Sequence, residues 1–106
     1  MEKSDIAVQL ASYRQTIDNI DAALLRILAE RFRCTNEIGA LKAEYNLPPV
    51  DKDRESLQYA RLRNLAEQAK LDQNFVEKLM KLIISEVVQR HGQIATEHQT
   101  RRKSAS

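Results

Sequence analysis

Apolar residues recur every three or four positions between residues 10 and 41, which is the spacing of one buried face of an α-helix. The stripe consists of Leu10, Tyr13, Ile17, Ile20, Leu24, Leu28, Cys34, Ile38 and Leu41. From about Asp5 to Tyr45 the chain contains no proline and a single glycine, Gly39. We therefore predict one very long first helix, which spans about 60 Å because each helical residue adds about 1.5 Å.

Two further helices are predicted after this one. Pro48 and Pro49 end the first helix, because the residue before a proline is driven out of the helical region. Asp51 is placed to cap a second helix from about Lys52 to Gln68, and Asp72 to cap a third, which again carries an apolar stripe. No strand pattern and no internal repeat are evident. The sequence predicts an all-α fold with three helices per chain: very long, medium and long.

The length of the first helix predicts a homodimer. A compact domain of this chain length has a diameter of about 35 Å. A helix of about 60 Å cannot bury its whole apolar stripe against its own chain. A second copy of the chain can cover the stripe, so we expect an intertwined homodimer.

The distribution of charge argues against nucleic acid as a partner. The formal net charge is +2, but the cations Arg101, Arg102 and Lys103 lie in a polar C-terminal segment. Without them the chain carries 14 basic and 15 acidic residues, whereas a nucleic-acid-binding protein would be expected to have a basic body. We expect one domain over residues 1–100 and a basic, disordered tail at residues 101–106.

Several classes of site and location are also disfavoured. No segment approaches the roughly 18 apolar residues of a membrane span, and no apolar segment follows the polar N-terminus, so we expect neither membrane association nor a signal peptide. Cys34 is the single cysteine, which fits a reducing cytoplasm. The two histidines and one cysteine do not supply the three or four ligands of a metal site. We expect a cytoplasmic protein without a metal.

Cations interrupt the apolar stripe of the first helix. Arg31 occupies the same heptad column as Ile17, Leu24 and Ile38, and Lys42 lies about 20° away from Arg31 around the helix. A cation that faces a core is costly unless an anion pairs with it. The alternatives are an ion pair with an acid of another helix and a bound anionic ligand. Such cations suit a reaction that holds a polyanion in one conformation while negative charge develops on an oxygen.

The order of these residues resembles the all-helical (AroQ-class) chorismate mutases. The residues are, in order, Arg14, Arg31, Lys42 and the segment 51–55. The interval from Arg31 to Lys42 and the interval from Lys42 to Arg54 both match those of the family. Local similarity is also found at residues 17–21, 28–31, 38–42 and 82–84, and the resemblance covers roughly residues 10–95. It implies a Claisen rearrangement of chorismate to prephenate in phenylalanine and tyrosine biosynthesis, with no cofactor and no covalent intermediate.

The resemblance also implies roles for the cations of the first helix. Arg31 and Arg14 would bind the carboxylates of chorismate, and Lys42 would bind the ether oxygen as its bond breaks. Helix geometry adds a constraint, because Arg14 lies about 25 Å along the helix from Arg31 and about 100° around it. Arg14 cannot reach a small ligand held by Arg31 of the same helix, whereas the partner's Arg14 can do so in a twofold dimer. We therefore expect two active sites, each shared by both chains.

The other two helices supply the remaining candidates. The resemblance implies that Arg54 adds positive field, while Glu55 and the backbone at Asp51 receive the ring hydroxyl. His91 occupies the position where the family commonly has Gln or Glu as a second donor to the ether oxygen, and we predict that its imidazole donates there. Val87 occupies a position where a serine often helps to hold a carboxylate. Because valine cannot donate, that carboxylate would be held less fully, or by a backbone group or water.

Two other functions fit part of the pattern. The isochorismate–pyruvate lyases resemble the mutases in fold and cations, and they eliminate pyruvate in salicylate formation. The segment 51–55 favours the mutase, because the hydroxyl-binding acid is a mutase feature. A non-catalytic helical dimerisation module is the second alternative. Charges in an apolar seam argue against it, since they would weaken a coiled-coil interface without setting an evident register.

Overall fold

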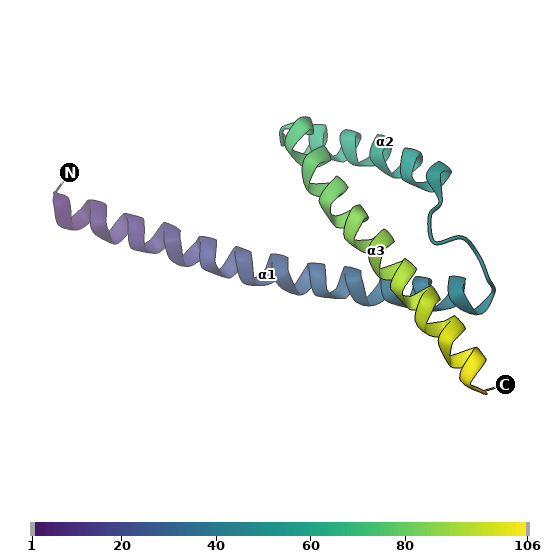
Figure 1. The fold of residues 1–106 in the computed structure, drawn as a ribbon. Coiled ribbons are helices and arrows are strands. Elements are labelled where there is room, and N and C mark those ends of the chain that lie inside the picture. Colours follow the sequence, from purple (N-terminus) through teal and green to yellow (C-terminus); the bar gives the residue numbers. More distant parts are fainter. Residues whose placement is uncertain (1, 106) are drawn as a thin grey trace. The chain divides into compact units, whose positions relative to one another are not determined.

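The computed structural model describes residues 2–105, and within that range it contains three helices (Figure 1). They are α1, Lys3–Glu44, α2, Lys52–Gln68, and α3, Gln73–Ala105. Their lengths are 42, 17 and 33 residues, and no described residue lies in a strand. The prediction of an all-α chain with a very long, a medium and a long helix is confirmed.

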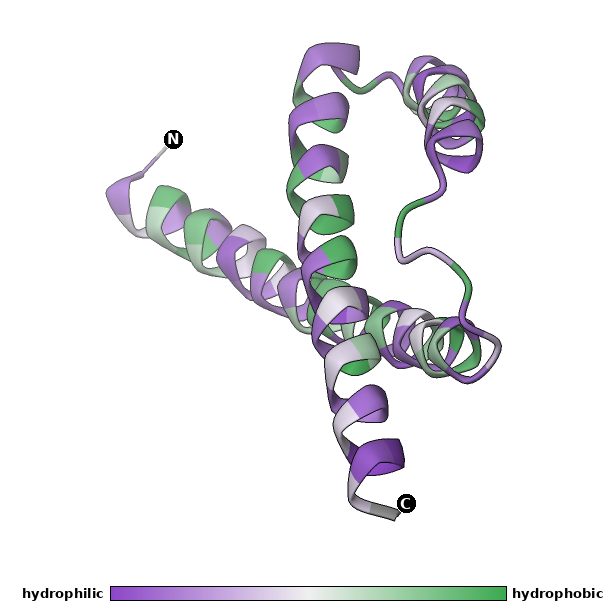
Figure 2. Ribbon diagram, turned by 45° about the vertical axis from the view of Figure 1, so that its right-hand side comes forward, coloured by the Kyte–Doolittle hydropathy of each residue, from purple (hydrophilic) through white to green (hydrophobic). Residues whose placement is uncertain are grey.

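The chain divides into two compact units, Met1–Cys34 and Thr35–Ser106. The described part of the first unit is helix α1 up to Cys34, and a lone helix has no second element on which to bury a face. Its large apolar side chains are accordingly exposed in the single chain, and Figure 2 shows hydrophobic positions recurring along this helix. The exposed apolar residues of this unit include Ile6, Val8, Leu10, Tyr13, Ile17, Ile20, Leu24, Leu25 and Ile27.

The second unit has a small core of its own. The chain reverses direction after α2, so that α3 runs back from its end, and the two helices pack against each other. The buried apolar residues among those described are Ala66, Ile83 and Ile84. Residues 35–44 of α1 also belong to this unit and meet α3 at Gly39, the buried residue of α1. This unit therefore brings the end of α1, the α1–α2 connection and the middle of α3 together.

Helix α1 ends in a left-handed turn before the prolines. Asn46 has a φ of 56°, the conformation that commonly closes a helix at its C-terminus. The Asn46 N–H donates to the Ala43 carbonyl at 3.3 Å, and the Leu47 N–H donates to the Lys42 carbonyl at 2.7 Å. This pattern is a Schellman motif, and it fixes the backbone of Lys42 in the last turn of α1. The stop that the sequence analysis assigned to the two prolines therefore comes a few residues earlier.

The predicted caps of the other helices are confirmed. Asp51 has extended backbone angles, and its carboxylate accepts a hydrogen bond from the Arg54 N–H at 3.0 Å. The Asp72 carboxylate accepts one from the Asn74 N–H, also at 3.0 Å. Each bond satisfies a donor that the first turn of a helix leaves without an intrahelical partner. The start of α2 is thus set by a side chain within the candidate site.

Helix α3 continues through Ala105, whereas the sequence analysis expected a disordered tail at residues 101–106. Residues 101–105 are helical, and residue 106 lies outside the described residues. No proline or glycine follows Gly92, and Arg102 and Lys103 lie in the last turn, where cations interact favourably with the helix dipole. These local preferences explain the extension. Within the described residues, no helix is both long enough and apolar enough to cross a membrane.

Candidate active site

The connection between α1 and α2 borders a cavity of about 370 Å³ that is open to solvent. Its walls come from the end of α1, the connecting segment and the first turn of α2. The lining residues are Lys42, Leu47, Pro48, Val50, Asp51, Lys52 and Asp53. The structure therefore brings two of the predicted site residues, Lys42 and Asp51, to the same cavity.

Lys42 is placed for an electrostatic role in this cavity. Its side chain is half-buried, and its backbone is held by the closing turn of α1. An ammonium group presents three donors and a compact charge, so it can hydrogen-bond an oxygen that enters the cavity. One oxygen of the Asp51 carboxylate, Oδ1, accepts the capping bond from the Arg54 N–H. The expected contact of the Asp51 backbone with a ligand stays a prediction.

Arg54 and Glu55 follow in the first turn of α2. The Arg54 side chain is exposed and that of Glu55 is half-buried. Tyr59 lies one turn further along the same helix, and its pKa is raised above the ordinary value of 10.0. The main cause is burial of the phenol, followed by the nearby charges of Glu55 and Glu77. Arg54 and Glu55 therefore add an exposed cation and a partly buried carboxylate to the same turn as Lys52 and Asp53 of the cavity wall.

Arg31, in the first unit, carries a buried guanidinium nitrogen, Nη1. Its side chain is half-buried, and in the part of the chain that the structure describes its Nη1 atom has no hydrogen-bond partner. The adjacent acid, Glu30, is bound instead by the Arg33 Nε at 3.0 and 3.1 Å, and this bond lowers the pKa of Glu30. A buried donor left unpaired is costly. Arg31 therefore has a guanidinium nitrogen available for an anionic ligand.

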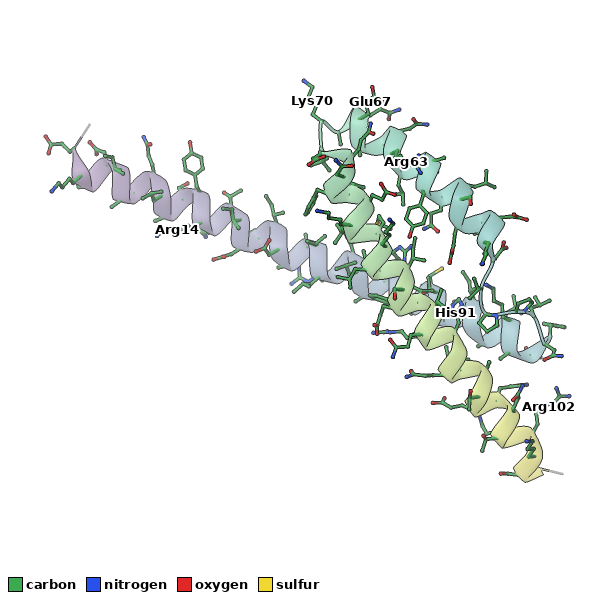
Figure 3. All side chains as sticks on the ribbon, turned by 45° about the horizontal axis from the view of Figure 1, so that its top comes forward. Arg14, Arg63, Glu67, Lys70, His91 and Arg102 are labelled. Atoms are coloured by element: carbon green, nitrogen blue, oxygen red, sulfur yellow. The ribbon has the colours of Figure 1, made fainter. Side chains whose placement is uncertain are left out.

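Arg14 also belongs to the first unit, where its side chain is exposed (Figure 3). Its predicted role depends on a second copy of the chain. That role stays a prediction.

His91 is buried in the second unit, with an exposed fraction of 5%. Its Nε2 lies 2.7 Å from the Thr35 carbonyl oxygen, and its Nδ1 lies 3.3 Å from the Pro49 carbonyl oxygen. The predicted donation from His91 to the ether oxygen would require the ring to release one of these carbonyls. That role stays a prediction. Val87, one turn earlier on α3, is half-buried and has no polar group to offer a ligand.

Sequence reasoning missed the part that Gly39 plays beside His91. A side chain at position 39 would place its Cβ 2.7 Å from the His91 Cδ2, so the glycine permits the close approach of the ring. One signal could have revealed this. Gly39 is the single glycine of a very long helix, where glycine costs about 1 kcal/mol relative to alanine. Among the described residues, no group of three or more His, Cys, Asp or Glu side chains could hold a metal ion.

Comparison with known proteins identifies the family. The family model described as chorismate mutase type II matches residues 13–92. The chorismate mutase of Methanocaldococcus jannaschii is 32% identical over 76 residues, which are 72% of this chain and 77% of that protein. The bifunctional chorismate mutase/prephenate dehydratase of Escherichia coli K12 is 33% identical over 89 residues, 84% of this chain but 23% of that protein.

The chain belongs to the chorismate mutase type II family, which is the AroQ class. The matched segment includes every predicted site residue from Arg14 to His91. The T-protein of Enterobacter agglomerans is similar over 81 residues at 31% identity, and this chain spans 22% of its length. For these longer relatives the similarity thus concerns one part of a larger protein.

Proposed function

We propose that this chain converts chorismate to prephenate without a cofactor, as a homodimer with two shared active sites, in the biosynthesis of aromatic amino acids. The observation that carries the proposal is the buried Nη1 of Arg31, which has no partner among the described residues. A dicarboxylate substrate supplies the anion that this donor lacks. The family match over residues 13–92 supports the same substrate.

The chemistry needs charge and shape rather than a nucleophile. In the rearrangement the ether C–O bond breaks while a C–C bond forms within the same molecule, so no group leaves and no proton has to move. Negative charge grows on the ether oxygen, where the Lys42 ammonium donates a hydrogen bond. Arg31 and the partner's Arg14 bind the two carboxylates and hold the reacting ends together. One donor aimed at developing charge is worth about 10²–10³ in rate, and fixing the conformation adds to this.

Residues of α2 and α3 complete the proposed site. Glu55 and the backbone at Asp51 receive the ring hydroxyl, and Arg54 adds positive field near the cavity. The resemblance would make His91 a second donor to the ether oxygen, a role in competition with its contacts to two backbone carbonyls, and Val87 leaves one carboxylate with a donor fewer. The exposed apolar stripe of the first unit supports the homodimer, since a second copy can cover it. A single cysteine fits an enzyme of the cytoplasm.

The deciding experiment incubates the purified full chain, without added cofactor, with chorismate and separately with isochorismate, and identifies the products by chromatography. We expect prephenate from chorismate. Pyruvate and salicylate from isochorismate, with little prephenate, would instead assign the chain to the lyase activity. A folded dimer that turns over neither substrate would refute both and leave the non-catalytic dimerisation module.

A variant pair ties the activity to this site. Lys42→Ala should abolish turnover while the dimer remains folded by circular dichroism and light scattering. Lys81→Ala provides the matched control, because Lys81 lies on α3 and contacts Glu77 at 3.6 Å, with a largely exposed side chain. A Lys42→Ala enzyme with a near wild-type rate would remove Lys42 from the mechanism.

A further inference from the structure

The His91 ring joins three segments that are far apart in the sequence. It projects from α3 (Figure 3), its Nε2 meets the Thr35 carbonyl of α1, and its Nδ1 meets the Pro49 carbonyl of the α1–α2 connection. Among the described residues, His91 is the polar residue that is buried, with an exposed fraction of 5%. Both contacts are made to backbone oxygens. A side chain thus ties two pieces of backbone to α3.

The chemistry of these contacts suits a clamp. Carbonyl oxygens only accept hydrogen bonds, and a carbonyl inside a helix keeps a second lone pair for an additional donor. A doubly protonated imidazole donates to both oxygens, whereas a neutral ring donates to one of them. In either state, a nitrogen that donates to a carbonyl is not free to donate to a substrate.

Gly39 makes the clamp possible. A Cβ at this position would lie 2.7 Å from the His91 Cδ2 and 2.9 Å from the Ile94 Cδ1. The isoleucine methyl is the end of a flexible side chain and can move. Each ring nitrogen lies within hydrogen-bonding distance of a carbonyl oxygen, so the ring cannot move without lengthening at least one of these contacts. Gly39 and His91 therefore fit each other as a pair.

The clamp acts on the backbone that leads into the candidate site. Pro49 lies two residues before Asp51, and its neighbours Pro48 and Val50 line the cavity that contains Lys42. Holding the Pro49 carbonyl fixes where the connection approaches α2. It thereby fixes the backbone at Asp51 and the position of Glu55 in the following turn.

We propose that His91, seated against Gly39, is a positioning residue that clamps the Pro49 segment so that Asp51 and Glu55 face the substrate held by Lys42. The proposal rests on the function proposed above for this segment. It assigns the role of His91 to the backbone rather than to the ether oxygen. The sequence-based role of His91 as a donor is thus the direct competitor.

The test compares His91→Ala, His91→Gln, Gly39→Ala and the double variant Gly39→Ala/His91→Ala in the full-length protein. Gly92→Ala is the matched control, because a Cβ at Gly92 meets no atom within 4 Å. The measurements are kcat and KM for chorismate, thermal stability, and hydrogen exchange at the Arg54 and Glu55 amides, which donate to Asp51 at 3.0 Å.

We expect Gly39→Ala and His91→Ala each to raise KM and to lower kcat/KM by on the order of tenfold or more. The Arg54 and Glu55 amides should exchange faster in both variants, because their acceptors belong to Asp51. Gly39→Ala should have a much smaller effect once His91 is alanine, because the clash is gone. Glutamine at position 91 carries both of its N–H donors on one nitrogen, whereas the imidazole faces the two carbonyls with separate nitrogens, so glutamine should not restore KM. Gly92→Ala should behave like the wild type.

Two results would overturn the proposal. A fully active His91→Gln enzyme, together with His91→Ala losing kcat at unchanged KM and unchanged exchange, would assign His91 to the ether oxygen. The variants could also melt at lower temperatures and yet keep an unchanged kcat/KM at temperatures below their melting points. The contact between Gly39 and His91 would then contribute to packing alone. If Gly39→Ala does not fold, His91→Ala and His91→Gln still decide the question. The exchange measurement needs no substrate, so it tests the clamp even if the wild type proves to have no mutase activity.

Discussion

The Arg31 Nη1 has no hydrogen-bond partner among the described residues, and this allows a single substitution to distinguish a ligand-binding role of Arg31 from a structural one. Arg31→Met keeps much of the apolar stem and removes the charged head. A buried donor without a partner costs about 1–3 kcal/mol, and Nη1 of Arg31 is such a donor within the described residues. The side chain is only half-buried, so the lower part of this range applies. We expect the free energy of unfolding to stay constant or to rise by about 1 kcal/mol.

Catalytic activity of Arg31→Met should fall, in contrast to its stability. A charge-assisted contact to a carboxylate is about twice as strong as a neutral hydrogen bond, and losing a donor that anchors the reacting substrate should lower kcat/KM by about 10²–10³. Urea denaturation at a fixed protein concentration and steady-state kinetics measure the two effects. Arg33→Met is the matched control, because Arg33 is exposed on the same helix and binds Glu30. It should retain full activity and lose little stability.

The opposite outcome would favour the structural alternative. If Arg31 were half of a buried ion pair, removing it would leave its partner's charge unpaired and cost about 3–5 kcal/mol. A loss of that size in Arg31→Met, with Arg33→Met unaffected, would therefore contradict the ligand role.

Three further predictions test other parts of the structure. Arg14→Ala and Lys42→Ala chains, inactive alone, should regain about one intact site per heterodimer when mixed; no recovery after verified subunit exchange would count against shared sites. Lys70→Gly should raise the free energy of unfolding by about 0.5–1 kcal/mol, since Lys70 has a φ of 58° in the turn after α2, whereas Lys78→Gly inside α3 should lower it in the same urea titration. Burial raises the pKa of Tyr59, so the unfolded chain ionises first and stability should fall as the pH rises above about 10; the fall should be shallower in Tyr59→Phe, and equal slopes would refute the assignment.

The helices were predictable because their signals are local. Helix α2 begins and ends at the predicted residues, Lys52 and Gln68, because Asp51 lies next to the turn that it caps. The end of α1 was predicted less accurately. It was assigned to the two prolines, whereas the left-handed turn at Asn46 depends on a conformation that asparagine adopts only in some contexts. The helical continuation to Ala105 was missed because a charged, polar segment resembles a tail when packing is unknown.

The environment of His91 was not predictable in the same way. Its ring nitrogens meet carbonyls that lie 42 and 56 residues away in the sequence. A backbone carbonyl is the same for every residue type, so no side-chain pattern marks it as a partner. The sequence could assign position 91 only by resemblance, and resemblance suggested a substrate donor. The structure places the same residue against backbone, and the two roles now differ in measurable ways.

Assembly and catalysis are expected to depend on the same segment of the chain. The first unit exposes its apolar side chains in the single chain, and an isolated helix is marginal in water without packing of its apolar face. This unit also carries Arg14 and Arg31. Dissociation should therefore melt much of residues 2–34 and remove the carboxylate-binding arginines at the same time. Dilution should lower specific activity and helical circular dichroism together, with a common midpoint, and saturating substrate should shift both to lower concentration. A monomer that keeps full activity at concentrations where light scattering shows no dimer would show that one chain builds a complete site without its partner's Arg14.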